Sequence, residues 1–293
     1  MTQDRGVAIN THQSGQEEID NVRQRSRERK QRLGRITPVA RDRLIAAAIA
    51  VGLIALAEIA ATRGWISDLI MPAPSDVFAN LVSGAQSGFY YRHIWATLSS
   101  AALGFLIGGT AALVIAGLLA SSRAIERVMM PFIIAFQALP RIAIAPLILI
   151  WFGYGLVGKV TIVAVVVFFP MLLTALQGFR VRDPNYLDLM AILGANRWQL
   201  WRHIRLPGSL PYVFSGIHIG VIYSLIGTVV AEFISSGTGL GFALIVAQSQ
   251  FATDTVFAVL IILMAIGSAL FGITRWLEKR ALFWATEVDQ GAG

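Results

Sequence analysis

Six apolar runs, each close to the length that crosses a bilayer, constrain this chain more than any other feature. They lie near residues 44–62, 95–120, 132–152, 160–178, 210–232 and 256–274. A helix needs about 20 apolar residues to cross the hydrocarbon, where its backbone polar groups must pair internally. Only 14% of the 293 residues are charged, against about 25% in soluble proteins. We therefore predict an all-α membrane protein with six spans.

The basic residues indicate how these spans are oriented. Twenty of the 24 Lys and Arg residues fall on one side of a six-span topology, in residues 1–43, 121–131, 179–205 and 275–293. The other side holds only Arg63, Arg92 and Lys159, and Arg141 lies within a span. Because basic loops stay in the cytoplasm, we expect both termini and the 179–209 loop to be cytoplasmic.

The terminal segments are polar. Residues 1–43 contain a dense basic run from Arg23 to Arg35 and too few apolar residues to fold alone. We expect a largely disordered cytoplasmic tail whose charge keeps the N-terminus inside, with a specific lipid or nucleic-acid role as the alternative. Residues 276–293 form a second cytoplasmic tail. Since the net charge of +7 comes from clusters between spans, no nucleic-acid partner is predicted.

The polar loop between the fourth and fifth apolar runs reads as helix, break and helix. Asp183 and Pro184 suit a helix start. Gly194 suits the helix end, because glycine adopts the left-handed conformation there. Asn196 suits the cap of a second helix, and Leu206-Pro207 predicts its end, since proline breaks the hydrogen-bond ladder.

The spacing in this loop resembles a known signature. Asp188 lies six residues before Gly194, nine residues separate Gly194 from Ile204, and Leu206-Pro207 follow. This is similar to the EAA loop of ABC-importer membrane subunits, with Asp188 in place of Glu and Leu189-Met190 in place of Ala-Ala. The phrase from Gly194 onward resembles the nitrate, taurine and alkanesulfonate permease branch.

The resemblance implies a type I ABC-importer permease in the bacterial cytoplasmic (inner) membrane. It implies a homodimer of this chain, a cytoplasmic ABC ATPase dimer and an extracytoplasmic solute-binding protein, besides membrane lipid. ATP and Mg²⁺ would bind the ATPase, and no cofactor would bind this chain. The loop would be the coupling helix that docks in the ATPase, through Asp188, Leu189, Ile192, Leu193, Gly194, Leu206 and Pro207.

The third apolar run is the most irregular. Pro140 and Pro146 predict breaks, and Arg141 lies at membrane depth. An arginine in lipid costs at least ~2.5–3.5 kcal/mol, so it should face a polar cavity or a partner. One interpretation places Gln137 and Arg141 on the translocation path of an anion such as a sulfonate, nitrate, bicarbonate or aromatic carboxylate. The alternative is a structural ion pair or subunit contact. Glu232, near the outer end of the fifth run, either pairs with Arg141 or is solvated, and joins the predicted path.

Three glycine patterns have different interpretations. Gly104 and Gly108 have the spacing of closely packed membrane helices, within this chain or between subunits. Residues 153–160 imitate a phosphate-binding loop, but Val160 replaces the required Ser or Thr, so we predict no nucleotide site. The phrase at 235–248 is similar to the family's outer gate or receptor-facing surface.

No catalytic constellation is visible in the sequence. The chain has no cysteine, and its four histidines lack metal-binding spacing. We therefore predict a permease that is not an enzyme. An ion-coupled secondary transporter is the alternative, which would work without an ATPase, and a membrane enzyme is a second alternative with no identifiable active site.

Overall fold

The computed structural model describes residues 38–180, 192–235 and 237–282. All regular elements in these ranges are helices, as predicted. The chain forms two units, Met1–Trp65 and Ile66–Gly293. In the first unit, the described part is α2 (Pro38–Thr62), whose segment Ile45–Thr62 is apolar enough to cross a membrane. Most of the predicted N-terminal tail lies outside the described residues, and its last residues begin α2.

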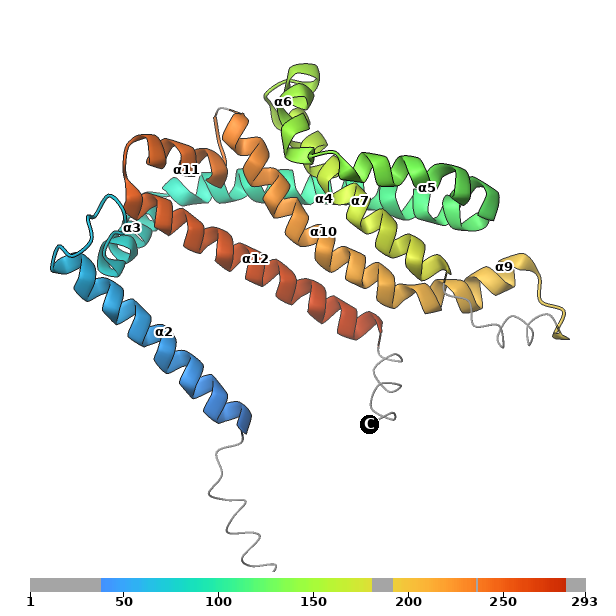
Figure 1. The fold of residues 1–293 in the computed structure, drawn as a ribbon, viewed down its shortest axis with the longest axis horizontal. Coiled ribbons are helices and arrows are strands. Elements are labelled where there is room, and N and C mark those ends of the chain that lie inside the picture. Colours follow the sequence, from blue (N-terminus) through green and yellow to red (C-terminus); the bar gives the residue numbers. More distant parts are fainter. Residues whose placement is uncertain (1–37, 181–191, 236, 283–293) are drawn as a thin grey trace, which may run out of the picture. The chain divides into compact units, whose positions relative to one another are not determined.

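The second unit contains the remaining helices (Figure 1). They are α3 (Pro74–Gln86), α4 (Phe89–Ser121), α5 (Arg123–Ala138), α6 (Arg141–Phe152), α7 (Leu156–Arg180), α9 (Arg197–Leu200), the π-helix η1 (Trp201–Arg205), α10 (Leu206–Ile234), α11 (Leu240–Ser249) and α12 (Thr253–Ala281). We call the end where α4 and α7 finish and α10 begins the inner end, and the opposite end the outer end.

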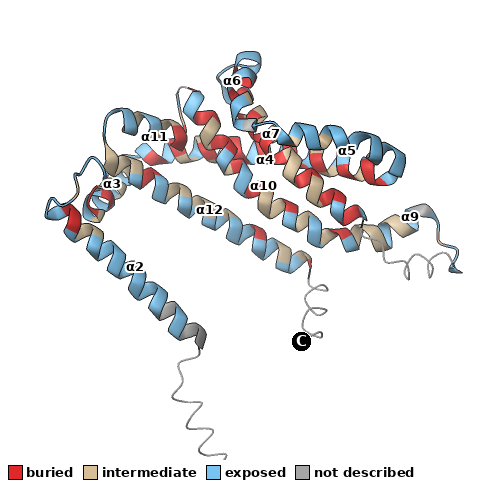
Figure 2. Cartoon of the chain, in the orientation of Figure 1, coloured by how far each residue is buried: buried red, intermediate tan, exposed pale blue. Residues whose placement is uncertain are grey.

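Helices α4, α7 and α10 form the packed centre of this unit, and Figure 2 shows buried residues along them. Side chains such as Ala116, Val167 and Leu172 fill the interface between α4 and α7. A Cβ atom on Gly108 would lie 2.3 Å from the carbonyl oxygen of Ala164 in α7. The glycine therefore allows the two backbones to approach, and Gly104 meets the same helix. This spacing serves packing within the chain.

The third apolar run is a bent pair of helices. Helices α5 and α6 meet at an angle of 96° at Leu139-Pro140. The break expected at Pro140 is confirmed, whereas the break expected at Pro146 is wrong, because Pro146 lies inside α6. Its neighbours Ala145 and Leu149 are fully buried against other helices, and this packing holds α6 together despite the missing hydrogen bond.

Five described helices are long and apolar enough to cross a membrane, and the α5–α6 pair makes six if it counts as one span. The predicted all-helical membrane fold is therefore confirmed. Two short helices, α3 and α11, pack beside α4 and α12 at the outer end. They were not among the predicted spans.

Candidate functional sites at the two ends of the bundle

The inner end carries the described part of the predicted coupling loop. Gly194 has φ +69°, the left-handed conformation expected of a helix-ending glycine. The backbone N–H of Gln199 donates to Asn196 Oδ1 at 2.8 Å, and the Asn196 N–H donates to Gln199 Oε1 at 2.9 Å. This reciprocal capping box confirms Asn196 as the helix cap. The left-handed glycine and the helix cap are therefore the residues that the sequence indicated, whereas the helix expected before Gly194 lies mostly outside the described residues.

The second helix does not end at Leu206-Pro207, so that prediction is wrong. The helix runs from α9 through η1 into α10, and Pro207 lies in the first turn of α10. In η1 the N–H of Leu206 donates to the carbonyl of Trp201, five residues back. This wider turn changes the hydrogen-bond register just before the proline, whose missing N–H the helix then tolerates. The helix that Asn196 caps therefore continues into the membrane helix α10.

Large apolar side chains are exposed around this break. Ile192, Leu193 and Trp198 expose 83%, 69% and 63% of their surface. The ring of Trp198 stacks on that of Trp201, with centroids 5.3 Å apart. Exposed apolar groups of this size next to a rigid helix end are typical of a protein contact surface. Asp188 and Leu189, the other predicted coupling residues, lie outside the described residues, together with Asp183 and Pro184.

Two of the predicted path residues flank the break between α5 and α6. Gln137 is half-buried in the last turn of α5, and Arg141 begins α6, although its side chain is outside the described part. A cavity of about 630 Å³ lies beside the break, lined by apolar side chains of α4, α5, α6 and α7 such as Leu139, Ile144 and Trp151. None of the described residues that line this cavity is charged.

Glu232 lies in the interior of the outer end. Its side chain is completely buried, so of the two alternatives for Glu232 solvation is wrong, while the pairing with Arg141 falls on a side chain outside the described part. The hydroxyl of Thr97 in α4 donates to its two carboxyl oxygens at 2.9 and 3.1 Å, and the N–H of Gly241 donates to Oε2 at 2.8 Å. These contacts attach the turn between α10 and α11 to α4. In this conformation Glu232 does not line an open path, because no part of it is exposed.

Two glycines make this enclosure possible. A Cβ atom on Gly239 would lie 2.0 Å from the carboxyl carbon of Glu232, and one on Gly241 would lie 2.9 Å from its Cβ. Gly239 also has φ +126°, which side chains rarely permit. Two of the glycines in the gate-like phrase are therefore required by the contact with Glu232.

Two further buried polar side chains hold the same turn. Lys159, in the first turn of α7, donates from Nζ to the carbonyl of Thr238 at 2.7 Å. His93 of α4 places Nδ1 2.9 Å from the carbonyl oxygen and 3.1 Å from the amide nitrogen of Gly239. Lys159 belongs to the stretch 153–160 that imitates a phosphate-binding loop, and in the structure its side chain holds this turn instead. We call Glu232, Thr97, Lys159 and His93 the outer clamp.

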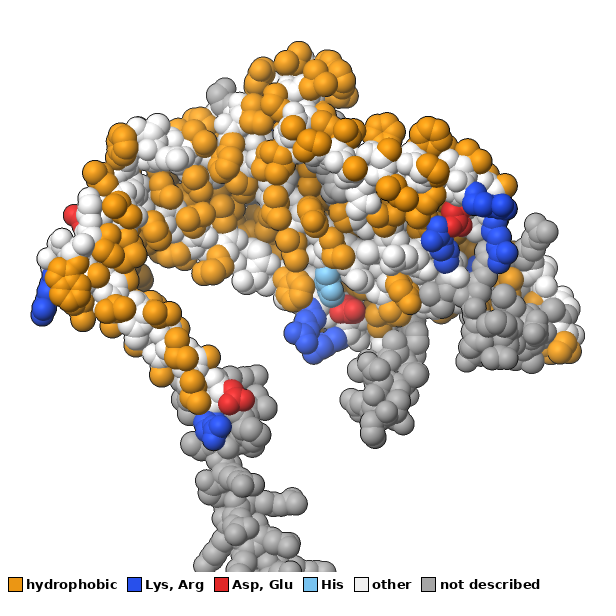
Figure 3. Space-filling model, in the orientation of Figure 1, with side chains coloured by type: hydrophobic (Ala, Val, Ile, Leu, Met, Phe, Trp, Pro, Cys, Tyr) orange, Lys and Arg blue, Asp and Glu red, His pale blue; other side chains and the backbone are white. Residues whose placement is uncertain are grey.

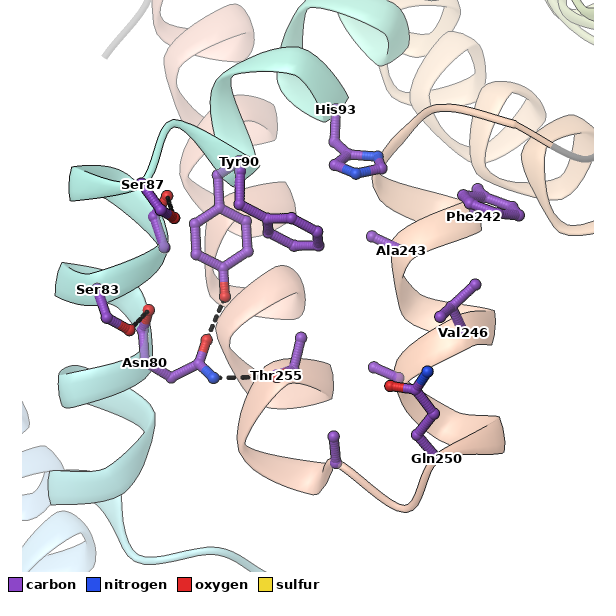
Figure 4. A pocket seen from close by; sticks show the side chains of 14 residues that line it. Asn80, Ser83, Ser87, Tyr90, His93, Phe242, Ala243, Val246, Gln250 and Thr255 are labelled. Carbon is purple, nitrogen blue, oxygen red and sulfur yellow. Dashed lines mark hydrogen bonds between the residues drawn. The ribbon is translucent and has the colours of Figure 1, made fainter.

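A cavity of about 580 Å³ opens beside the outer clamp, between α3, α4, α11 and α12 (Figure 4). Asn80 lies in its wall and donates from Nδ2 to Thr255 Oγ1 at 3.0 Å, while the Tyr90 hydroxyl donates to Asn80 Oδ1. His93 and Phe242 lie on the opposite wall, with near-parallel rings 6.5 Å apart. None of the described residues that line it is Lys, Arg, Asp or Glu.

Thr97, Lys159 and His93 were not predicted from the sequence as parts of a site. A signal existed for α4, because His93, Thr97 and Ala101 recur at the four-residue spacing that places side chains on one helix face, and all three are buried. Two polar groups on the buried face of an apolar helix indicate a polar partner within the membrane domain. Glu232 was visible as an ionisable residue, but the sequence did not indicate that it pairs with Thr97, which lies more than 130 residues away.

The fold and its two ends define a class: a helical membrane permease with an exposed contact surface at one end and a clamped turn at the other. The chain matches the family model described as "Binding-protein-dependent transport system inner membrane component" over residues 104–282, and it belongs to this family. It is a permease subunit of an ABC importer, as its sequence resemblance implied.

Individual relatives agree with this assignment. The chain is 34% identical to the riboflavin transport system permease protein of Chloroflexus aurantiacus over 73% of its length and 80% of the relative. It is 29% identical to a putative aliphatic sulfonates permease of Bacillus subtilis over 81% of its length and 86% of the relative. A chain of the inward-facing MetNI methionine ABC transporter has the same fold, with TM-score 0.57, 17% identity, and coverage of 66% and 95%.

Proposed function

We propose that this chain forms, with a second copy of itself, the translocation path of an ABC importer for a small organic or inorganic anion in a bacterial inner membrane. A cytoplasmic ATPase pair docks at the inner end and an extracytoplasmic binding protein delivers the solute at the outer end. The observation that carries this proposal is the exposed apolar surface of Ile192, Leu193 and Trp198 beside the glycine break. This surface lies at the start of the helix that Asn196 caps and that continues into α10.

The continuity of this helix supports a mechanism. The ATPase pair changes shape when ATP binds, and it moves the docked segment of each copy. Because α9, η1 and α10 are one uninterrupted helix, the movement reaches the outer end, where Glu232 in the last turns of α10 holds α11. A partner that binds one conformation better shifts the population between inward- and outward-open states.

The substrate class rests on Arg141. It begins α6 directly after the break, four residues beyond the half-buried Gln137, and a positive charge within a membrane-spanning segment attracts an anion. The relatives support transport of an organic solute. Their named solutes differ in charge, because the relatives include a riboflavin permease and a sulfonate permease. Glu232, although buried in the present conformation, becomes part of the path only when the outer clamp opens.

Reconstituted transport tests the proposal. Proteoliposomes with the chain and its ATPase, supplied with binding protein and a labelled alkanesulfonate, should take up solute only with ATP. Arg141→Gln should reduce sulfonate uptake at least tenfold, whereas Arg92→Gln, an outer arginine, should not. Uptake driven by an ion gradient without ATP would support a secondary transporter instead. Equal uptake by the wild type and Arg141→Gln would refute the anion assignment.

A further inference from the structure

A basic recess lies at the inner end, where α4 finishes and α5 begins. It is lined by Arg123, Glu126 and Arg127 of α5 and by Arg180, the last residue of α7, and it encloses about 470 Å³. Figure 3 shows basic side chains gathered around an acidic one in this region, where α4 finishes and α5 begins. The recess is separate from the exposed apolar surface of Ile192, Leu193 and Trp198.

The charges of this recess do not balance. Glu126 forms an ion pair with Arg180. Arg127 Nε donates to the carbonyl of Arg123 at 3.4 Å, and neither Arg123 nor Arg127 has a carboxylate partner among the described residues. Among the described residues that line the recess, three positive groups and one negative group leave two positive charges. Guanidinium groups present paired N–H donors that match phosphate oxygens, so the recess suits a phosphate ligand.

The surroundings indicate where that phosphate comes from. The α5 helix has no buried residue, and Ile125, Val128 and Phe132 expose 51%, 62% and 57% of their surface. The arginines therefore stand where an apolar helix surface begins, which is the level of lipid headgroups at a membrane boundary. Basic pockets between membrane helices at the cytoplasmic boundary bind anionic lipid headgroups.

We propose that the recess of Arg123, Arg127 and Arg180 binds the phosphate groups of an anionic phospholipid, with its acyl chains along the apolar surface of α5. Two unpaired positive charges match a lipid with two phosphates, of the cardiolipin type. Glu126 sets the strength of the site, because it neutralises Arg180.

Native mass spectrometry of the full chain in mild detergent, titrated with cardiolipin, tests this proposal. The double variant Arg123→Gln/Arg127→Gln removes both unpaired charges and leaves the Glu126–Arg180 pair intact. We expect each lost arginine to weaken binding about fivefold, and the double variant to weaken it ~25-fold. Glu126→Gln should have the opposite effect and retain more lipid, because it releases Arg180.

Controls separate the headgroup site from general charge and from folding. Arg275→Gln removes one exposed arginine from the same end, on α12, and should leave lipid binding unchanged. The thermal midpoint of the lipid-free chain should be the same in the double variant and the wild type. Phosphatidylcholine, which has a phosphate but no net charge, should bind equally weakly to all variants.

Three results would overturn the proposal. One is that Arg275→Gln weakens cardiolipin binding as much as each arginine removed in the double variant does. Another is stabilisation of the chain by inorganic phosphate alone, as large as that by cardiolipin and lost in the double variant, which would identify a site for the free ion. The third is unchanged lipid binding combined with loss of the co-purifying ATPase, which would make the recess a protein contact.

Discussion

The Thr97→Val substitution tests whether the outer clamp holds the α10–α11 turn. The Thr97 hydroxyl donates to Glu232 and accepts the N–H of Leu240 at 2.8 Å. Valine keeps the shape of the side chain, which is fully buried, and removes both interactions. The carboxyl group loses a donor and the Leu240 amide loses its acceptor. The unpaired Leu240 amide costs about 1–3 kcal/mol, and the carboxyl group, which keeps the N–H of Gly241, loses one hydrogen bond of about 1 kcal/mol, so the closed turn should lose about 2–4 kcal/mol.

A thiol-labelling assay measures this loss. The chain has no cysteine, so Leu240→Cys at the start of α11 supplies the only thiol, at a position that is fully buried and does not line the cavity of Figure 4. A membrane-impermeant maleimide reaches it only when the turn opens. Because 1.4 kcal/mol corresponds to a factor of ten, a loss of 2–4 kcal/mol should raise the labelling rate about 30- to 700-fold.

Two matched variants make the assay decisive. Thr97→Ser keeps the hydroxyl and should label close to the wild-type rate. Ser99→Ala removes a hydroxyl from the same helix that donates to its own helix carbonyl, that of Ala96, and should also have little effect. If Thr97→Val labelled no faster than Ser99→Ala, the clamp would not hold the turn and the reasoning would be refuted.

Three glycine substitutions test the remaining structural claims. Gly239→Ala places a Cβ atom 2.0 Å from the Glu232 carboxyl carbon and should lower the thermal midpoint by several degrees; an unchanged midpoint would contradict the enclosure. Gly108→Val forces α4 away from Ala164 and should lower the free energy of unfolding, measured with detergent or denaturant, by about 1–3 kcal/mol. The control Gly117→Val should cost much less, because a Cβ atom there meets nothing within 4 Å. Gly194→Pro should abolish transport and leave membrane insertion intact, as judged by expression and uptake; normal uptake would refute the coupling assignment.

The helices were predictable because their signal is local. About 20 apolar residues in succession leave the chain few alternatives to a membrane helix, so α4, α7, α10 and α12 follow from composition. The capping box of Asn196 and the left-handed Gly194 were also predictable, because both depend on neighbouring residues. The continuation through Pro207 was not, since a local π-turn accommodates a residue that alone predicts a helix end.

The outer clamp shows why the rest escaped prediction. Glu232 was visible as an ionisable residue near a span end, but its environment is set by α4, which lies 135 residues away in the chain. Lys159 looked like an outer loop residue and is buried against the Thr238 carbonyl. Pairings of this kind depend on how helices pack, and one sequence does not show which helix faces which.

The central claim is that the inner end of this permease docks on an ATPase, and co-purification from the native host tests it most directly. The tagged chain, isolated in mild detergent, should carry a soluble ATPase that mass spectrometry identifies. Leu193→Asp, which places a charge in the exposed apolar surface, should release the ATPase, while Arg275→Gln at the same end should retain it. Recovery of the chain alone, still moving solute in ATP-free liposomes, would contradict the account.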